Sequence, residues 1–248
     1  MNFKMKALVA AAAVAMSGVA HADIVNFDEA GSGSVLLSIW NPTNSVSALF
    51  DLGVSMDSFA SFSSVDLSVG DYATTWARIA PHLAGANFMV FAGDIDASAP
   101  LKNSFLSSVG SGTAEATNQQ VKDMGNVRFF VSPSEVLGNH AVAANGANFS
   151  DSASAYQGTQ VGSDWSGSVS FNATAGIGEF VDVYSFAGPD PVGRGASAGG
   201  APAQVAFLTS VQLGANGVVA AVPEPETYAM LLAGLGLIGG IARRRAAR

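Results

Sequence analysis

The sequence contains no cysteine and very few positive charges outside its two ends. Without cysteine, disulfide bonds, thiol nucleophiles and cysteine-based zinc sites are excluded. Between residues 23 and 222 there are 17 acidic and 5 basic residues, a formal net charge of 5 − 17 = −12. Phosphate binding needs clustered Lys and Arg, so nucleic acid is excluded as a partner. We expect a domain of about 200 residues that depends on its apolar core alone.

Residues 1–22 have the features of a secretory signal peptide. Lys4 and Lys6 precede the apolar run 7–16, and Ala20-His21-Ala22 offers the small residues of a cleavage site. We therefore predict export, with cleavage directly after Ala22 and a mature domain over residues 23–222.

The last 26 residues combine three unlike elements in order: Pro223-Glu224-Pro225, the apolar run Ala229–Ala242, and Arg243-Arg244-Arg245. As a helix, the run would be about 21 Å long, against roughly 30 Å of hydrocarbon in a bilayer. It is therefore short for a permanent anchor, and only a transient association with the inner membrane is expected. The arginines should stop transfer and stay in the cytoplasm, which places the body outside the inner membrane.

These three elements resemble the PEP-CTERM sorting signal of Gram-negative bacteria, and the resemblance covers residues 223–248 only. It implies that a membrane transpeptidase, exosortase, cuts near Pro-Glu-Pro and releases or transfers the protein outward. Proteins with this signal are associated with exopolysaccharide, biofilm and floc formation. The resemblance thus implies a destination at the cell surface or in the extracellular matrix. The alternative is an ordinary tail anchor with a proline-rich hinge.

The body is predicted to be mainly β, as a β-sandwich or jelly-roll-like domain with one or two short surface helices. Short apolar or alternating runs bounded by turn residues indicate the strands. We expect strands at 34–41, 46–52, 87–93, 127–131, 168–174, 179–187, 205–213 and 218–222. A helical turn is expected at 56–62 and a surface helix at 114–124, while 72–79 fits either a strand or a helix.

Two finer predictions concern the second half of the body. In strand 179–187, alternation places Phe180, Tyr184 and Phe186 on one face. In strand 205–213, it places Val205, Phe207, Val211 and Leu213 on a single face. Asn216-Gly217 is typical of a type I′ turn leading into the last strand.

Few residues suggest chemistry. Asp94 and Asp96 follow a predicted strand and could help to bind Ca²⁺ with loop carbonyls, or simply form a turn. Trp165 lies in a polar stretch and is the candidate for stacking on a sugar ring, whereas Trp40 lies in an apolar run and is expected in the core. Apart from this weak calcium candidate, we expect no metal and no other cofactor.

No catalytic residue is predicted. The segment Gly195-Ala196-Ser197-Ala198-Gly199 matches the nucleophile-elbow pattern, but it lacks the flanking strand and helix and a later histidine. His82 and His140 fit no metal-binding or catalytic pattern, and a structural or exposed role is expected for both.

Three hypotheses on function remain. The first is a non-enzymatic surface or matrix protein, structural or adhesive, that associates with exopolysaccharide. The second is a carbohydrate-binding module or a carbohydrate-active enzyme, which would need two carboxylates across a cleft. The third is a cation-binding surface protein, which a calcium-dependent shift in melting temperature would indicate.

Overall fold

The computed structural model describes residues 33–94, 104–109, 115–124, 146–151, 156–159, 161, 173–187 and 202–222. Their strands are β1 (Ser34–Asn41), β2 (Val46–Ser55), β3 (Ser64–Asp66), β4 (Asn87–Asp94), β5 (Ser104–Val109), β6 (Ala147–Ser150), β7 (Ala175–Gly176), β8 (Phe180–Ala187), β9 (Gln204–Leu213) and β10 (Val218–Val222). The helices are η1 (Met56–Ser61), η2 (Gly70–Tyr72), α2 (Ala73–Ile79), η3 (Ala80–His82) and α3 (Asn118–Met124).

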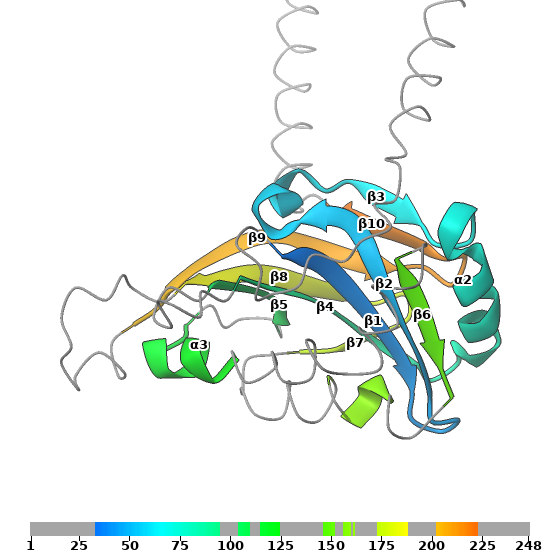
Figure 1. Cartoon of the computed structure of the whole chain (residues 1–248). Coiled ribbons are helices and arrows are strands. Elements are labelled where there is room, and N and C mark those ends of the chain that lie inside the picture. Colours follow the sequence, from blue (N-terminus) through cyan, green and yellow to red (C-terminus); the bar gives the residue numbers. More distant parts are fainter. Residues whose placement is uncertain are drawn as a thin grey trace, which may run out of the picture.

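All ten strands belong to one curled antiparallel sheet with the order β3-β10-β9-β8-β5-β4-β1-β2-β6, and β7 pairs separately with β4 (Figure 1). The prediction of a mainly β domain is confirmed. The narrower prediction of a sandwich or jelly roll stays a prediction.

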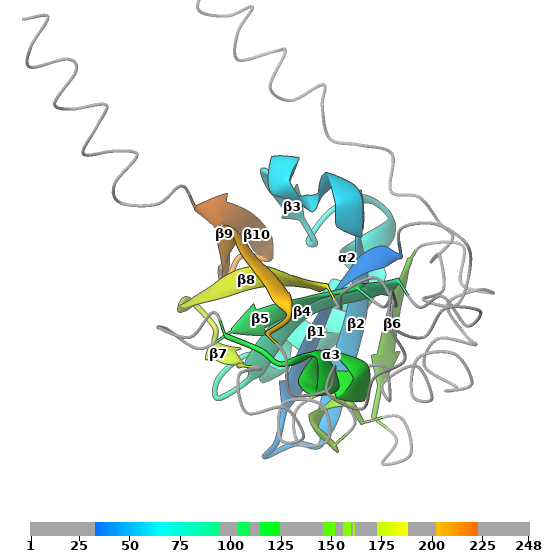
Figure 2. The same ribbon diagram turned by 90° about the vertical axis from the view of Figure 1, so that its left-hand side faces the viewer.

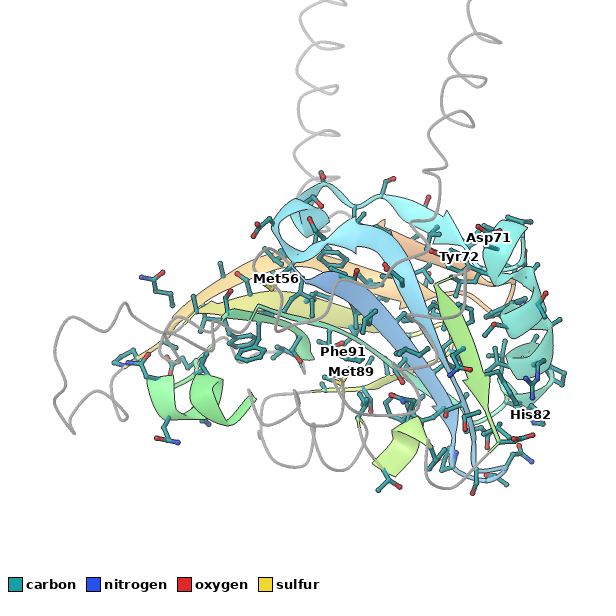
Figure 3. All side chains as sticks on the ribbon, viewed as in Figure 1. Met56, Asp71, Tyr72, His82, Met89 and Phe91 are labelled. Carbon is teal, nitrogen blue, oxygen red and sulfur yellow. The ribbon has the colours of Figure 1, made fainter. Side chains whose placement is uncertain are left out.

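Strand β1 lies inside the sheet, between β4 and β2, and all eight of its residues are buried. Its odd-numbered side chains, such as Leu37, pack in one core with η1 and α2, while Leu36 and Trp40 join a second core on the other face. Met89 and Phe91 of β4 belong to this second core and lie together beneath the sheet in Figure 3. The near-continuous apolar run of β1 is therefore explained by cover on both faces.

Helices α2 and α3 lie in different places around the sheet (Figures 1 and 2). The ambiguous stretch 72–79 forms a helix, and its Trp76 and Ile79 are buried in the first core. Helix α3 begins later than predicted because Thr117 and Gln120 form a capping box. The Thr117 amide donates to Gln120 Oε1 at 2.8 Å, and the Gln120 amide donates to Thr117 Oγ1 at 3.2 Å.

The prediction that the apolar side chains of β9 share one face is wrong. The face assigned to Phe180, Tyr184 and Phe186 in β8 agrees with the structure, with Phe186 in the second core and Val181 and Val183 in the first. In β9, however, the register with β8 shifts between Val183 and Tyr184. As a result, Val205 packs against the second core, whereas Val211 and Leu213 belong to the first. An extra residue in a strand reverses the alternation beyond it, and the sequence carries no sign of this bulge.

Tyr72 links the helical layer to the sheet (Figure 3). Its hydroxyl donates a hydrogen bond to the backbone carbonyl of Asp51, and its ring meets Phe50 edge to face at 5.9 Å. Burial, with a smaller contribution from the charges of Asp51 and Asp71, raises the pKa of Tyr72 far above its ordinary value.

We predict an alkaline loss of stability through Tyr72. Its pKa is higher in the folded chain than in the unfolded chain, so the stability is complete below about pH 10 and falls as the pH rises further. In Tyr72→Phe, urea unfolding at pH 7 should show a loss of about 1–2 kcal/mol with the hydrogen bond. The free energy of unfolding should then fall less steeply above pH 10 than in the wild type. If the free energy of unfolding fell equally steeply with pH in both proteins above pH 10, this role of Tyr72 would be contradicted.

Candidate functional site

The β9–β10 hairpin positions the C-terminal end of the body. Its loop comprises residues 214–217, and the Gly214 amide donates to the Val218 carbonyl at 2.9 Å. Gly217 has φ +89°, whereas Asn216 does not have a positive φ. The predicted type I′ turn is therefore wrong, because that turn needs a positive φ at both central residues. The four-residue loop places only a glycine in the left-handed region.

Trp76 of α2 closes this hairpin from the side. A Cβ atom on Gly217 would lie 2.9 Å from Trp76 Cε2, so the backbone of the loop touches the indole directly. The Leu67 amide also donates to the Gly217 carbonyl at 2.9 Å. The turn before β10 is thus held by both a ring and a hydrogen bond.

Strand β10 is paired on both sides. Val219 pairs with Leu213 of β9 and with Val65 of β3, and its side chain is fully buried. At the end of the strand, the Ala221 amide donates to the Ser63 carbonyl at 2.8 Å, and Val222 pairs with Ser210. The sheet therefore holds the chain up to the residue before Pro223.

A small polar surface surrounds this end of β10. Ser210 Oγ donates to Asp182 Oδ1 at 2.6 Å across β9 and β8, in the same row as Val222. On the β3 side, the side chains of Ser61, Ser63 and Ser64 are exposed. We call the five residues Ser61, Ser63, Ser64, Asp182 and Ser210 the β10 rim.

Most of the predicted site residues lie outside the described residues. These are Ala20, Ala22, Asp96, Trp165, Pro223, Glu224, Pro225, Arg243, Arg244 and Arg245. Asp94 is the last residue of β4 and pairs with Ser104. In the described ranges there is no group of three or more side chains suited to a metal ion. The calcium site stays a prediction.

Aromatic side chains follow the outer part of β8 and β9. Trp40 is 5% exposed, which confirms its predicted place in the core. Phe180, by contrast, is 56% exposed. Further along the same face, Tyr184 and Phe207 are half-buried and meet edge to face with 5.3 Å between their ring centres. The alternation of β8 predicted this face, but the sequence does not show which of its aromatics lies in the open.

One comparison with known proteins identifies a motif, at the C-terminus. Residues 221–246 match the PEP-CTERM protein-sorting motif, so the resemblance seen in the sequence is confirmed. Neither a curated protein nor a solved structure matches the chain. The motif indicates sorting by exosortase, a membrane enzyme, to the cell surface or the extracellular space. Its first two residues are the last two of β10.

Among the helices of the described ranges, none is long and apolar enough to cross a membrane. The apolar run 229–242 and the signal peptide 1–22 lie outside those ranges.

Proposed function

We propose that this protein is a non-enzymatic component of the cell surface or extracellular matrix of a Gram-negative bacterium, structural or adhesive in association with exopolysaccharide. The sorting motif at residues 221–246 carries the proposal, because it directs the body outward. The body supports it in two ways. Its chain contains no cysteine and needs no disulfide bond, and its net charge of −12 keeps it soluble outside the cell.

The arrangement of β10 fits such a sorting route. The motif begins where the sheet ends, so a cut shortly after Val222 leaves every described strand in the mature protein. The signal and the folded body are then separable without loss of core residues. A structural protein released in this way keeps its full stability.

The aromatic face of β8 and β9 supports attachment to a glycan and also suits the second candidate, a carbohydrate-binding module. Aromatic rings contribute large amphipathic contact areas at binding surfaces. Phe180 stands exposed, and Asp182 lies between it and Tyr184 along the strand. The ring offers a surface for the apolar side of a sugar, and the carboxylate accepts hydrogen bonds from its hydroxyl groups.

Intact mass spectrometry of cell, envelope and medium fractions tests this function. We expect a species outside the cell that runs from Asp23 to a residue between Val222 and Glu226. That species should bind exopolysaccharide from the same cells, and Phe180→Ala should weaken the binding by about fivefold to tenfold, the loss of one aromatic contact.

Two outcomes would contradict the proposal. A species in the membrane that retains Arg243–Arg248 would make the protein an anchored envelope protein. An external species that does not bind the polysaccharide would contradict the adhesive role. Thr43→Ala at the far β1–β2 turn is the control for the Phe180 variant, since Thr43 is also exposed to solvent but belongs to another part of the sheet.

A further inference from the structure

The sorting signal leaves the body at a strand that cannot easily move. Strand β10 lies between β3 and β9, and Val219 is fully buried. Releasing Ala221 and Val222 would break the hydrogen bond to Ser63 and the pairing with Ser210. The processing enzyme must therefore bind the residues after Val222 while β10 stays paired in the sheet.

The first residues of the signal are close to the body. Pro225 is three residues beyond Val222, and three residues span at most about 11 Å. An enzyme that binds Pro223-Glu224-Pro225 therefore works within about 11 Å of the end of β10, close enough to contact the surface around it.

That surface is the β10 rim, at the end of the molecule that carries η1 and β3 (Figure 1). The side chains of the rim are four serines and one aspartate, small and without positive charge. Arg78 lies over β6, where its guanidinium stacks on Phe149 at 4.1 Å and lies 3.8 Å from the Asp151 carboxylate. The rim thus presents hydroxyl groups and one negative charge to whatever approaches it.

We propose that the β10 rim is a docking surface for the exosortase-type enzyme that processes the signal, and that the facing surface of the enzyme is polar and basic. This inference rests on the proposed sorting function. It adds that the enzyme contacts the folded body as well as the signal.

The bilayer is the competing occupant. From Val222 to Ala229 the chain spans at most about 25 Å, so the membrane lies within reach of the rim before processing. Anionic lipid attracts clustered Lys and Arg, and the rim has neither. Charge therefore favours the enzyme over the lipid surface.

The test measures the rate of C-terminal processing of the full chain, by pulse-chase in the exosortase-containing host. The double substitution Ser63→Arg and Ser64→Arg places two large positive side chains on the rim. We expect processing to slow by about tenfold, since juxtaposed like charges weaken docking strongly. Thr43→Arg with Asn44→Arg adds the same charge at the β1–β2 turn, at the opposite end of the molecule (Figure 1), and should be processed at the wild-type rate.

A linker variant separates docking from misfolding. Twelve Gly and Ser residues inserted between Val222 and Pro223 move the signal away from the rim. In the wild-type background this insertion should slow processing about as much as the double substitution, because the signal no longer lies beside the docking surface. In the Ser63→Arg, Ser64→Arg background it should cause little further slowing, and the thermal unfolding of each variant should match that of the wild type.

Three outcomes would overturn the inference. The first is an unchanged or faster rate in the double variant, as expected if the bilayer occupied the rim. The second is a wild-type rate when the linker alone is inserted. The third is an equal slowing by the control pair. A wild-type chain that is never processed would instead remove the sorting function itself.

Discussion

Replacing Gly217 by alanine should lower the free energy of unfolding by about 2–5 kcal/mol, through two separate effects. At φ +89° a side chain is strained whatever space surrounds it, at a cost of about 1–2 kcal/mol. The new Cβ would also lie 2.9 Å from Cε2 and 3.1 Å from Cζ2 of Trp76, which are rigid ring atoms in a packed core. Forcing them apart costs a further 1–3 kcal/mol or so. Urea unfolding monitored by tryptophan fluorescence measures the sum.

Gly178 provides a matched control for this variant. Its φ of +88° is nearly the same, but a Cβ added there would meet nothing within 4 Å. Gly178→Ala should therefore show the backbone strain alone. The difference between the two variants isolates the contact with Trp76. If both variants lost the same free energy of unfolding, the Trp76 indole would move aside at no cost, and it would not hold the turn in place.

A double-mutant cycle completes the test. Trp76→Phe removes part of the indole and leaves room beside the turn, at its own cost in packing. Combined with Gly217→Ala, it should cost less than the sum of the two single changes. Strict additivity would mean that the two residues do not interact, against the 2.9 Å approach.

This turn also shows why part of the fold could be predicted from the sequence and part could not. Strand β1 begins and ends where its apolar run and the following turn residues placed it, because eight adjacent residues all have to be buried. The turn type at Asn216-Gly217 was predicted wrongly, because the loop between Leu213 and Val218 has four residues, whereas a type I′ hairpin turn needs a loop of two. Trp76, which packs against this loop, is 140 residues from Asn216 along the chain, so no local pattern shows the contact.

The bulge in β9 and the capping of α3 illustrate the same limit in different ways. The bulge turns the side chains of Val205 and Val211 to opposite faces, and no residue in between marks it. The capping box of Thr117 and Gln120 does have a local sequence signal, which the prediction of a helix at 114–124 overlooked. The first error follows from tertiary packing, whereas the second was avoidable.

The same distinction between local pattern and tertiary structure applies to the candidate site. The sorting signal is recognised from its sequence because all its elements follow one another within residues 221–246. The β10 rim, in contrast, joins residues near 63 with residues near 182 and 210, which only the pairing of β8, β9, β10 and β3 brings together. Sequence alone shows where the signal lies, and the fold shows what surrounds the end of β10.

Among the polar residues at the β1–β2 end of the sheet, Asn41 should be the one whose substitution lowers the free energy of unfolding most. It is 1% exposed, and its side chain makes four hydrogen bonds. Nδ2 donates to the carbonyls of His82 at 2.7 Å and Ala84 at 2.9 Å, and Oδ1 accepts from the amides of Thr43 at 2.8 Å and Asn44 at 3.0 Å. The amide thereby fastens the β1–β2 turn to the segment that leads into β4.

Asn41→Asp keeps the shape but replaces the donor by a second acceptor. At pH 7 a buried negative charge would face two carbonyl oxygens, and we expect a loss of about 3–5 kcal/mol. Asn41→Ala removes all four hydrogen bonds without adding charge and should cost about 2–3 kcal/mol. Urea unfolding at pH 7 and pH 4 distinguishes the two causes. The loss in Asn41→Asp should shrink at pH 4, because a protonated carboxyl group donates again, whereas the loss in Asn41→Ala should not change. If Asn41→Asp were as stable as the wild type at pH 7, the two carbonyls could not be the partners of Nδ2, and the turn would be held in place by packing alone.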